Sequence, residues 1–270
     1  MVSPDDRFMR VFASLLAASL ALAAPADASP RRVASLNLCT DELVLMLADP
    51  AQIASVTHLS QSPAETPLWR LARRHGHNDG SLLSVAPLRP DLVVTMGGGA
   101  RDRLRIAARL GIPTLDLPFA RSIADVERSI GRLAEALGRP AAGAALLRRI
   151  RALKRTAPPA RTETIWLGGG GRTVAADGLE AQWMRLAGLR QRPVRGDRIS
   201  LEELLVRPPQ VVLRSDYRQG QYSGAQRWLS HPLARRPAGS RLIVTDGRRW
   251  TCMGPLLIAE TLRLRRALQR

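Results

Sequence analysis

The segment SLLSVAPLRPDLVV at residues 81–94 has a second copy in the same chain, SLEELLVRPPQVVL at residues 200–213. The two copies align without a gap at an offset of 119 residues, from Ser81 to Ser200. Each begins with a serine that can cap a short helix, continues into a turn broken by proline, and ends in an apolar run typical of a buried strand. We therefore expect two related α/β lobes, one built around each copy.

Apolar runs and short amphipathic stretches alternate on both sides of these segments. This alternation is typical of parallel α/β units. The predicted fold class is α/β, with two lobes of mainly parallel sheets, a long rigid helix that joins them, and a ligand cleft between them. Strands are predicted at residues 33–36, 53–57, 91–96 and 114–117, and again at 164–167, 211–213 and 242–245.

A wholly helical stretch separates the two halves of the chain. Its helical spacing begins at Ile123, is interrupted at residues 138–140, and resumes as far as Lys154. The prolines at 158–159 then end it. We assign residues 29–137 to an N-terminal lobe, 138–157 to a linker helix and 158–270 to a C-terminal lobe.

The charge of the chain is strongly positive and comes almost entirely from arginine. The 270 residues include 41 Lys+Arg against 23 Asp+Glu, a formal net charge of +18. The arginines are scattered along the chain rather than gathered in a stripe or tail, which does not favour nucleic-acid binding. We interpret the scattered arginines first as a bias in coding and second as a surface suited to anionic ligands or envelopes.

The N-terminus has the layout of a secretory signal peptide. Arg7 and Arg10 precede an apolar run of fourteen residues, 11–24. That run is too short to span a bilayer, which needs about 20 residues. The small residues Ala26-Asp27-Ala28 follow as a cleavage signal. We expect residues 1–28 to be removed and the mature protein to be exported.

Ligands of open α/β sheets bind outside the carboxyl ends of the strands, and two facing lobes would place these loops around one cleft. Rings in the loops would supply large contact areas, and arginines would pair with anionic groups. The candidate ligand-binding residues are Asn37, Cys39, His58, Gly98, Arg101 and Phe119 in the first lobe, and Arg172, Tyr217, Tyr222, Arg248 and Trp250 in the second.

The two cysteines, Cys39 and Cys252, both fall in predicted cleft loops, one in each lobe. An exported protein meets an oxidising compartment, where pairing is allowed. Three interpretations stay open: buried free thiols, a disulfide between the lobes, or contact with a ligand or metal. No metal site is predicted, because His75 and His77 alone do not supply three or four converging ligands.

Several segments together resemble the periplasmic substrate-binding proteins of ABC importers for cobalamin, ferric siderophores and haem. The resemblance rests on RRVASLNLCTDELVLMLADPAQIASVTHLS (31–60), on the two repeated segments, and on RLGIPTLDLP (109–118) and RLIVTDGRRWTCMGP (241–255). It implies a periplasmic, monomeric binding protein without enzymatic activity or cofactor, which takes a metal chelate to an ABC permease and its ATPase.

The resemblance also implies that an acidic residue on each lobe contacts arginines of the permease. Glu202 matches that position in the second lobe. In the first lobe the matching residue is Leu83, with Glu65 as a possible substitute. This departure leaves an alternative function, an exported sensor or interaction module on the same fold. A periplasmic enzyme that uses Cys39 is a further alternative.

The sequence does not identify the chelate. A ferric siderophore with negative charge would suit Arg101, Arg172 and Arg248. A corrinoid would rest more on the aromatic rings of Trp250, Tyr217 and Phe119. Haem would need an axial ligand, for which the candidates are Tyr217, Tyr222 and His58.

Overall fold

The two repeated segments fold into the same unit in a computed structural model that describes residues 29–97, 101–217, 224–235 and 238–270. Ser81 Oγ accepts a hydrogen bond from the backbone N–H of Ser84 at the start of α4 (Leu82–Val85). Ser200 Oγ does the same for Glu203 at the start of α9 (Leu201–Val206). The strands that follow are β4 (Leu92–Met96) and β8 (Val211–Ser215).

Each of these strands lies inside a parallel sheet. The first sheet has the order β3-β2-β1-β4-β5 and the second the order β7-β6-β8-β9. The register matches as well: Val33 pairs with Leu92 in the first lobe, and Thr164 with Val211 in the second. The other strands are β1 (Val33–Ser35), β2 (Ile53–Thr57), β3 (Gly76–Asn78), β5 (Thr114–Leu117), β6 (Thr162–Leu167), β7 (Leu189–Gln191) and β9 (Arg241–Thr245).

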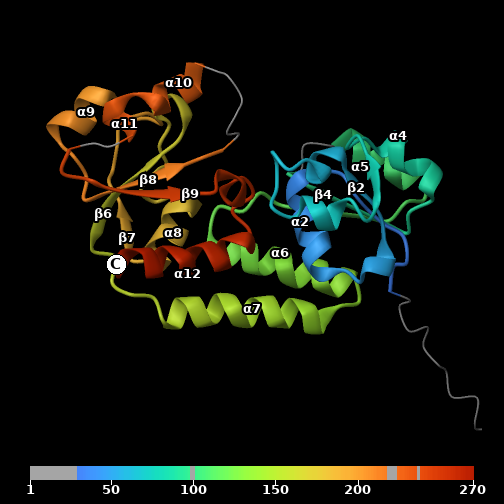
Figure 1. Ribbon diagram of the computed structural model, residues 1–270. Helices are drawn as coiled ribbons and strands as arrows, with labels where there is room; N and C mark the ends of the chain where they lie inside the picture. The colour runs from blue at the N-terminus through green and yellow to red at the C-terminus, as the bar shows by residue number, and fades with distance from the viewer. Residues whose placement is uncertain (1–28, 98–100, 218–223, 236–237) are drawn as a thin grey trace, which may run out of the picture.

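The predicted fold class is therefore confirmed: two α/β lobes with parallel sheets lie side by side (Figure 1). Strands β3 and β7 were not predicted. Each has only three residues, too few to show a periodicity. The remaining helices are α2 (Leu38–Leu47), α3 (Trp69–Ala72), α5 (Arg101–Arg109), α6 (Ile123–Ala136), α7 (Pro140–Arg155), α8 (Leu179–Leu186), α10 (Gly224–Ser230), α11 (Pro232–Arg235) and α12 (Leu256–Leu268). Short 3₁₀ turns lie at Pro50–Gln52, His58–Gln61, Ala86–Leu88, Gly169–Gly171 and Gly247–Trp250.

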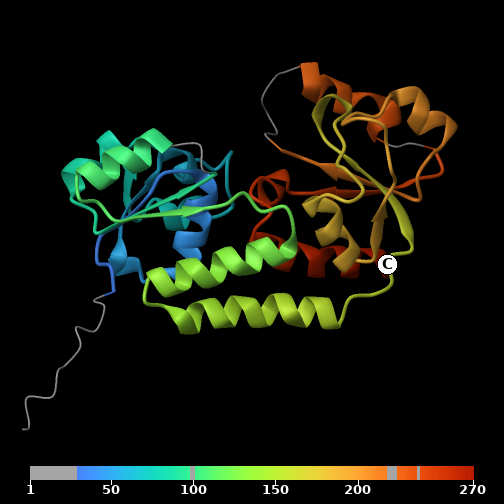
Figure 2. The same cartoon turned by 180° about the vertical axis from the view of Figure 1, so that it is seen from behind.

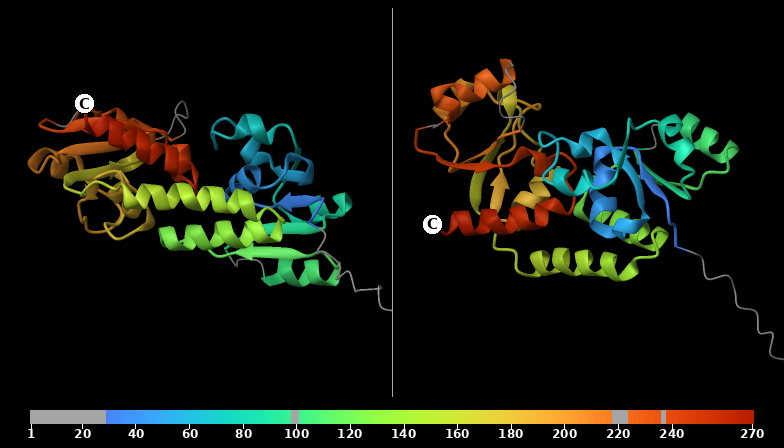
Figure 3. Two further views of the ribbon diagram at one scale, coloured as in Figure 1. Left: turned by 90° about the horizontal axis from the view of Figure 1, so that it is seen from below. Right: turned by 45° about the vertical axis from the view of Figure 1, so that its right-hand side comes forward.

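The connection between the lobes is a pair of helices rather than a single one. Helices α6 and α7 run side by side beneath both lobes, as the views from behind and from below show (Figures 2 and 3). The backbone N–H of Ile123 donates to Gln182 of α8 at 3.1 Å, so α6 begins against the second lobe. The carbonyl of Leu137 accepts from Gln52 at 3.0 Å, so α6 ends against the first. Gly138, with φ +64, allows the reversal into α7.

The largest hydrophobic core is continuous through this helical pair. It joins Val44 and Leu117 of the first lobe to Ile130 and Ile150 of the pair and to Trp183 of the second lobe, and all five side chains are buried. Burial of this shared core favours one arrangement of the two lobes, because separating them would expose apolar surface. The lobes are therefore packed onto a common base.

Some of the predicted features lie outside the described residues. These are the signal peptide at 1–28, Gly98 and Tyr222. Arg101 begins α5, but its side chain is not among those described. Within the described ranges, none of the helices combines the length and the apolar character that crossing a bilayer requires.

Candidate ligand-binding site

Three contacts hold the two lobes together along their seam. Cys39, in the first turn of α2, forms a disulfide with Cys252, and their Cα atoms lie 5.2 Å apart. The hydroxyl of Tyr217 donates to Glu65 Oε2 at 2.7 Å. A third contact comes from Arg248, whose Nη1 donates to the carbonyl of Pro63 at 2.6 Å. The carboxyl ends of strands from both lobes therefore meet at this seam.

A pocket of about 490 Å³ opens at the same place. One wall comes from the loop after β2 in the first lobe, and the other from the ends of β8 and β9 in the second. This position, outside the carboxyl ends of parallel strands, is where open α/β sheets bind ligands. Its lining residues are Pro63, Ala64, Asp216, Val244, Thr245, Asp246 and Arg248.

Asp246 and Arg248 form one hydrogen-bonded unit on the pocket wall. Asp246 caps the 3₁₀ turn at 247–250 by accepting from the backbone N–H of Arg248 at 3.2 Å. Its two carboxylate oxygens also accept from Arg248 Nε at 2.8 Å and Nη2 at 2.7 Å. Burial acts to raise the pKa of Asp246, but the hydrogen bonds from Arg248 outweigh it and the pKa is lowered. The pKa of Arg248 is raised by the same contact, so both groups stay charged.

The second carboxylate of the pocket is paired in the same way. Asp216 accepts from Arg214 Nε at 2.9 Å, and both side chains are largely buried. The charged groups that line the pocket thus meet opposite charges within the protein. The wall presents paired hydrogen-bonding groups to a ligand rather than an unpaired positive charge.

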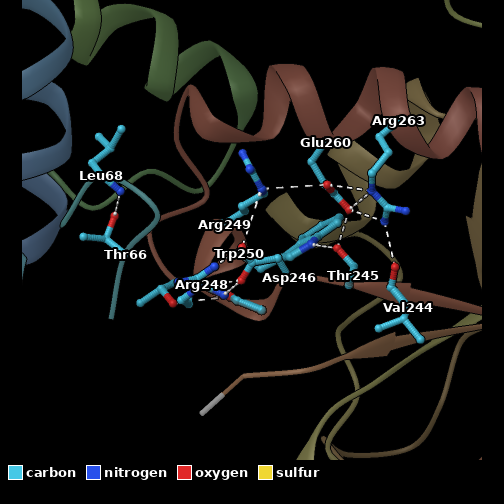
Figure 4. A network of polar contacts seen from close by, with 12 residues as sticks. Thr66, Leu68, Val244, Thr245, Asp246, Arg248, Arg249, Trp250, Glu260 and Arg263 are labelled. Carbon is cyan, nitrogen blue, oxygen red and sulfur yellow. Dashed lines mark hydrogen bonds and ion pairs between the residues drawn. The ribbon is translucent and has the colours of Figure 1, made fainter. Parts of the chain in front are cut away.

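The expectation of an aromatic ring at the cleft is wrong for Trp250. Its side chain is only 3% exposed and belongs to the main hydrophobic core. Its Nε1 donates to Thr245 Oγ1 at 2.8 Å, and its ring meets Trp166 edge to face. Trp250 therefore reaches the pocket wall only through its hydrogen bond to Thr245, which lines the pocket (Figure 4).

The same network continues to a buried carboxylate. Glu260, 3% exposed on α12, accepts from Thr245 Oγ1 at 2.5 Å and from Arg263 Nη2 at 2.6 Å. Arg249 lies between Asp246, at 3.8 Å, and Glu260, at 4.0 Å (Figure 4). This chain of charges fixes the end of β9, which carries the pocket wall.

Other predicted ligand residues have different surroundings. Asn37 caps α2, because its Oδ1 accepts from the backbone N–H of Thr40 at 2.9 Å. Arg172 pairs with Asp197 at 3.3 Å, and both side chains are mostly exposed. Neither Asn37 nor Arg172 lines the pocket described above.

Two other first-lobe candidates are exposed on the surface. His58 is exposed, and its Nδ1 lies 3.3 Å from the carbonyl of Asn78. Phe119 is 67% exposed and lines a second, smaller pocket together with both cysteines. Its ring lies over Gly97, where a Cβ atom would come within 2.4 Å of it.

The disulfide decides among the three interpretations of the cysteines. Both sulfurs are bonded to each other, so neither residue has the thiolate that nucleophilic catalysis or metal ligation requires. A periplasmic enzyme that uses Cys39 therefore has no nucleophile in this structure. The described residues also contain no group of three or more side chains arranged to hold a metal ion.

Sequence reasoning missed some residues of the seam. Glu65 was considered as an acidic contact for a permease, but the structure engages it with Tyr217 across the seam. Asp246 was not singled out, although an aspartate two residues before an arginine at a strand end is a signal for a capped, ion-paired turn.

The two positions expected to meet a permease lie on matching helices. Glu202 is exposed on α9, and Leu83 is 76% exposed on α4. The two helices lie on the upper faces of opposite lobes (Figure 1). Hydrogen bonds with its own backbone N–H and with Ser200 lower the pKa of Glu202, so this carboxylate is ionised at neutral pH.

Comparisons with known proteins agree with the two-lobed fold described above. The family model described as "Periplasmic binding protein" matches residues 33–239. The chain therefore belongs to the periplasmic binding protein family, a family of binding proteins rather than enzymes. No curated protein matches the chain.

Solved structures with this fold include haem- and vitamin B12-binding proteins. The structure of a periplasmic haem-binding protein from Pseudomonas aeruginosa matches with a TM-score of 0.63 at 22% identity, over 88% of this chain and 92% of that one. The haem-binding protein RhuT from Roseiflexus matches at 0.64 and 21%, over 88% and 98%. The vitamin B12-binding protein BtuF of Vibrio cholerae matches at 0.61 and 16%, over 89% and 97%. At these identities the likeness concerns the fold.

Proposed function

We propose that this protein captures a metal chelate in the cleft between its lobes and delivers it to an ABC importer from the periplasm. The observation that carries the proposal is the pocket of about 490 Å³ whose walls come from both lobes at the carboxyl ends of their strands. A cleft of this size, open to solvent and shared by two lobes, suits a bulky ligand. Haem-, corrinoid- and siderophore-type chelates are the ligand classes to be distinguished.

The groups on the wall bear on the choice of chelate. Arg248 already donates to Asp246 and to the carbonyl of Pro63, so an anionic siderophore would have to displace one of these contacts. Trp250 is buried, which removes one ring proposed for a corrinoid. Tyr217 would have to exchange Glu65 for the metal to act as an axial ligand of haem. An anionic siderophore and haem thus predict different broken contacts.

Native mass spectrometry of the protein taken from its own periplasm is the first experiment. We expect a bound species with the mass of a metal chelate. Titration of the purified protein with haem, cobalamin and ferric siderophores then gives affinities. Saturable one-to-one binding of one class supports the proposal, whereas no binding of any of the three, together with no copurified chelate, contradicts it.

Two arginine variants form a matched pair for locating the ligand. Arg248 lines the pocket, whereas Arg172 is paired with Asp197 outside it. Arg248→Ala is expected to weaken chelate binding by about tenfold, which corresponds to about 1.4 kcal/mol, and Arg172→Ala to leave it unchanged. Equal effects of the two substitutions would place the ligand elsewhere.

Delivery requires docking to the permease. We expect Glu202, ionised and exposed on α9, to pair with a permease arginine, and Leu83 on α4 to make an apolar contact. Glu202→Ala should weaken co-purification with the permease, while the neighbouring Glu203→Ala should not. Chelate binding without any permease association would favour a sensor or interaction module instead.

Export is the remaining part of the proposal. Residues 1–28 have the layout of a cleavable signal peptide. N-terminal sequencing of the mature protein should begin at Ser29. A mature protein that retains residues 1–28 would contradict export through a cleaved signal.

A further inference from the structure

A second pocket, of about 170 Å³, lies between the lobes on the side of α6. It is separate from the larger pocket, because the two share no lining residue. Most of its wall is apolar and includes the side chains of Met96, Val126, Leu179 and Met253. Met96 belongs to β4 of the first lobe and Val126 to α6 of the helical base. Leu179 begins α8 of the second lobe, and Met253 lies just before α12. The pocket therefore exists only while the lobes stay together.

The disulfide forms part of the wall of this pocket. Cys39 contributes from the first lobe and Cys252 from the second. The covalent bond fixes the separation of the two walls, so the pocket is preformed. A preformed cavity binds a small ligand without the entropic cost of bringing its walls together.

Three polar side chains interrupt the apolar lining, those of Ser129, Glu42 and Thr251, and the Thr251 hydroxyl donates to the carbonyl of Gly247 at 3.5 Å. Ser129 on α6 is 4% exposed, and its Oγ has no hydrogen-bond partner among the described residues. Glu42 on α2 is 1% exposed, and Oε1 accepts from the hydroxyl of Thr66 at 2.7 Å. A buried hydroxyl without a partner is uncommon, because leaving it unpaired is unfavourable. Such a group calls for an explanation, and a bound polar atom would provide it.

We propose that this pocket is a second binding site, which takes a ring-sized, mostly apolar molecule that carries one hydroxyl group. The size sets the first limit, because an apolar cavity of about 150 Å³ accommodates benzene. Ser129 and Glu42 set the second, because they supply the polar groups that one ligand hydroxyl can meet. A simple phenol fulfils both conditions. The proposal does not depend on the identity of the chelate or on transport.

Burial also determines the charge state of the acidic group. It raises the pKa of Glu42 to about 8, so the carboxyl is neutral and can donate a hydrogen bond at pH 7. A neutral hydroxyl compound is therefore preferred over a carboxylate or a cation. Benzoate and benzylammonium, which are both charged at pH 7, are suitable negative controls for phenol.

Methionine methyl NMR offers a direct test. The lining contains Met96 and Met253, whereas Met46 and Met184 lie outside the pocket and serve as internal controls. Titration of ¹³C-methyl-methionine protein with phenol should shift the signals of Met96 and Met253 saturably, with a Kd of about 1 mM for a ligand of this size. The signals of Met46 and Met184 should stay in place.

A filling variant and a polar variant sharpen the result. Ala120→Leu reduces the pocket volume and should weaken phenol binding at least about tenfold, with Val126→Phe as the replacement if that variant does not fold. Ser129→Ala keeps the volume and should weaken binding about fivefold. The proposal is overturned if phenol gives no saturable shift up to about 20 mM, a concentration far above the expected Kd. It is also overturned if the filling variants bind as wild type does, or if benzoate binds as well as phenol.

Discussion

The two lobes share one framework but treat their buried carboxyl groups differently. In the first lobe, Asp41 accepts from Thr57, the last residue of β2, with Oγ1 at 2.5 Å. In the second, Glu260 accepts from Thr245, the last residue of β9, also at 2.5 Å. Glu260 in addition pairs with Arg263, whereas one oxygen of Asp41 is buried and has no hydrogen-bond partner in the part of the chain that the structure describes.

The buried carboxyl groups of the two lobes therefore have different electrostatic surroundings. Burial is the main influence on both first-lobe carboxyls, and it raises the pKa of Asp41 to about 6 and that of Glu42 to about 8. In the second lobe the hydrogen bonds that Arg263 donates to Glu260 raise the pKa of Arg263, which keeps the guanidinium charged. In each lobe a buried carboxyl group thus contacts a strand-end threonine, at β2 in the first lobe and at β9 in the second, and Glu260 is in addition paired with Arg263.

The largest expected effect concerns the bond that joins the lobes. The disulfide connects residues 213 positions apart, and closing so long a loop in the unfolded chain corresponds to about 5 kcal/mol in the chain-entropy model. Cys39→Ser and Cys252→Ser should each lower the free energy of unfolding by that order, measured by urea denaturation. The double variant should match the single ones, and a clearly additive loss would show that the cysteines contribute separately.

Glu42→Gln is expected to have the next largest effect, and it depends on pH. The folded-state pKa of about 8 exceeds the ordinary 4.5, so between these values the folded chain holds a proton that the unfolded chain has released. Stability therefore falls as pH rises from about 4.5 to 8.

The amide of this variant keeps an acceptor for Thr66 without a charge to bury. At pH 9 we expect Glu42→Gln to be more stable than wild type by a few kcal/mol, and at pH 4 to be similar, by urea unfolding at both values. Parallel pH profiles of the two proteins would contradict the raised pKa.

Arg263→Gln should make the second lobe resemble the first. The variant leaves Glu260 buried without its closest cation, so the free energy of unfolding should fall. Because Arg263 is 41% exposed, the expected loss at pH 7 is only about 1–2 kcal/mol. Urea unfolding at pH 7 measures it, and a stability equal to that of wild type would exclude the role of the ion pair.

The smallest effect is expected at the seam. Tyr217→Phe removes the hydrogen bond to Glu65 and should reduce the free energy of unfolding by about 1 kcal/mol or less. A double-mutant cycle with Glu65→Gln isolates the contact. A coupling energy indistinguishable from zero would show that this contact does not hold the lobes together.

The sequence predicted the parts of the fold that repeat. The alignment of residues 81–94 with 200–213 located α4 with β4 and α9 with β8, because each copy carries its own helix cap and apolar strand. Strands β3 and β7 were not predicted, because a strand of three residues shows no periodicity. The linker was predicted as one helix because spacing alone does not show that α6 starts against the second lobe.

The candidate site was less predictable for a similar reason. Position after a strand predicted that Arg248 and Tyr217 lie at the seam, and the structure places both there. The same rule placed Trp250 in the cleft, yet its Nε1 found a partner in Thr245 and the ring went into the core. Asn37, which the same rule placed in the cleft, caps the start of α2 with its side chain. The direction of a side chain depends on tertiary neighbours, which a linear pattern does not contain.

We propose that a metal chelate lies between the lobes, against the loop after β2 and the ends of β8 and β9. Anomalous diffraction from crystals grown with the chelate that binds in solution locates the metal directly. We expect a single strong anomalous-difference peak within the larger pocket, between Pro63 and Asp246. A metal bound on the outer face of either lobe, with the pocket unchanged, would contradict it.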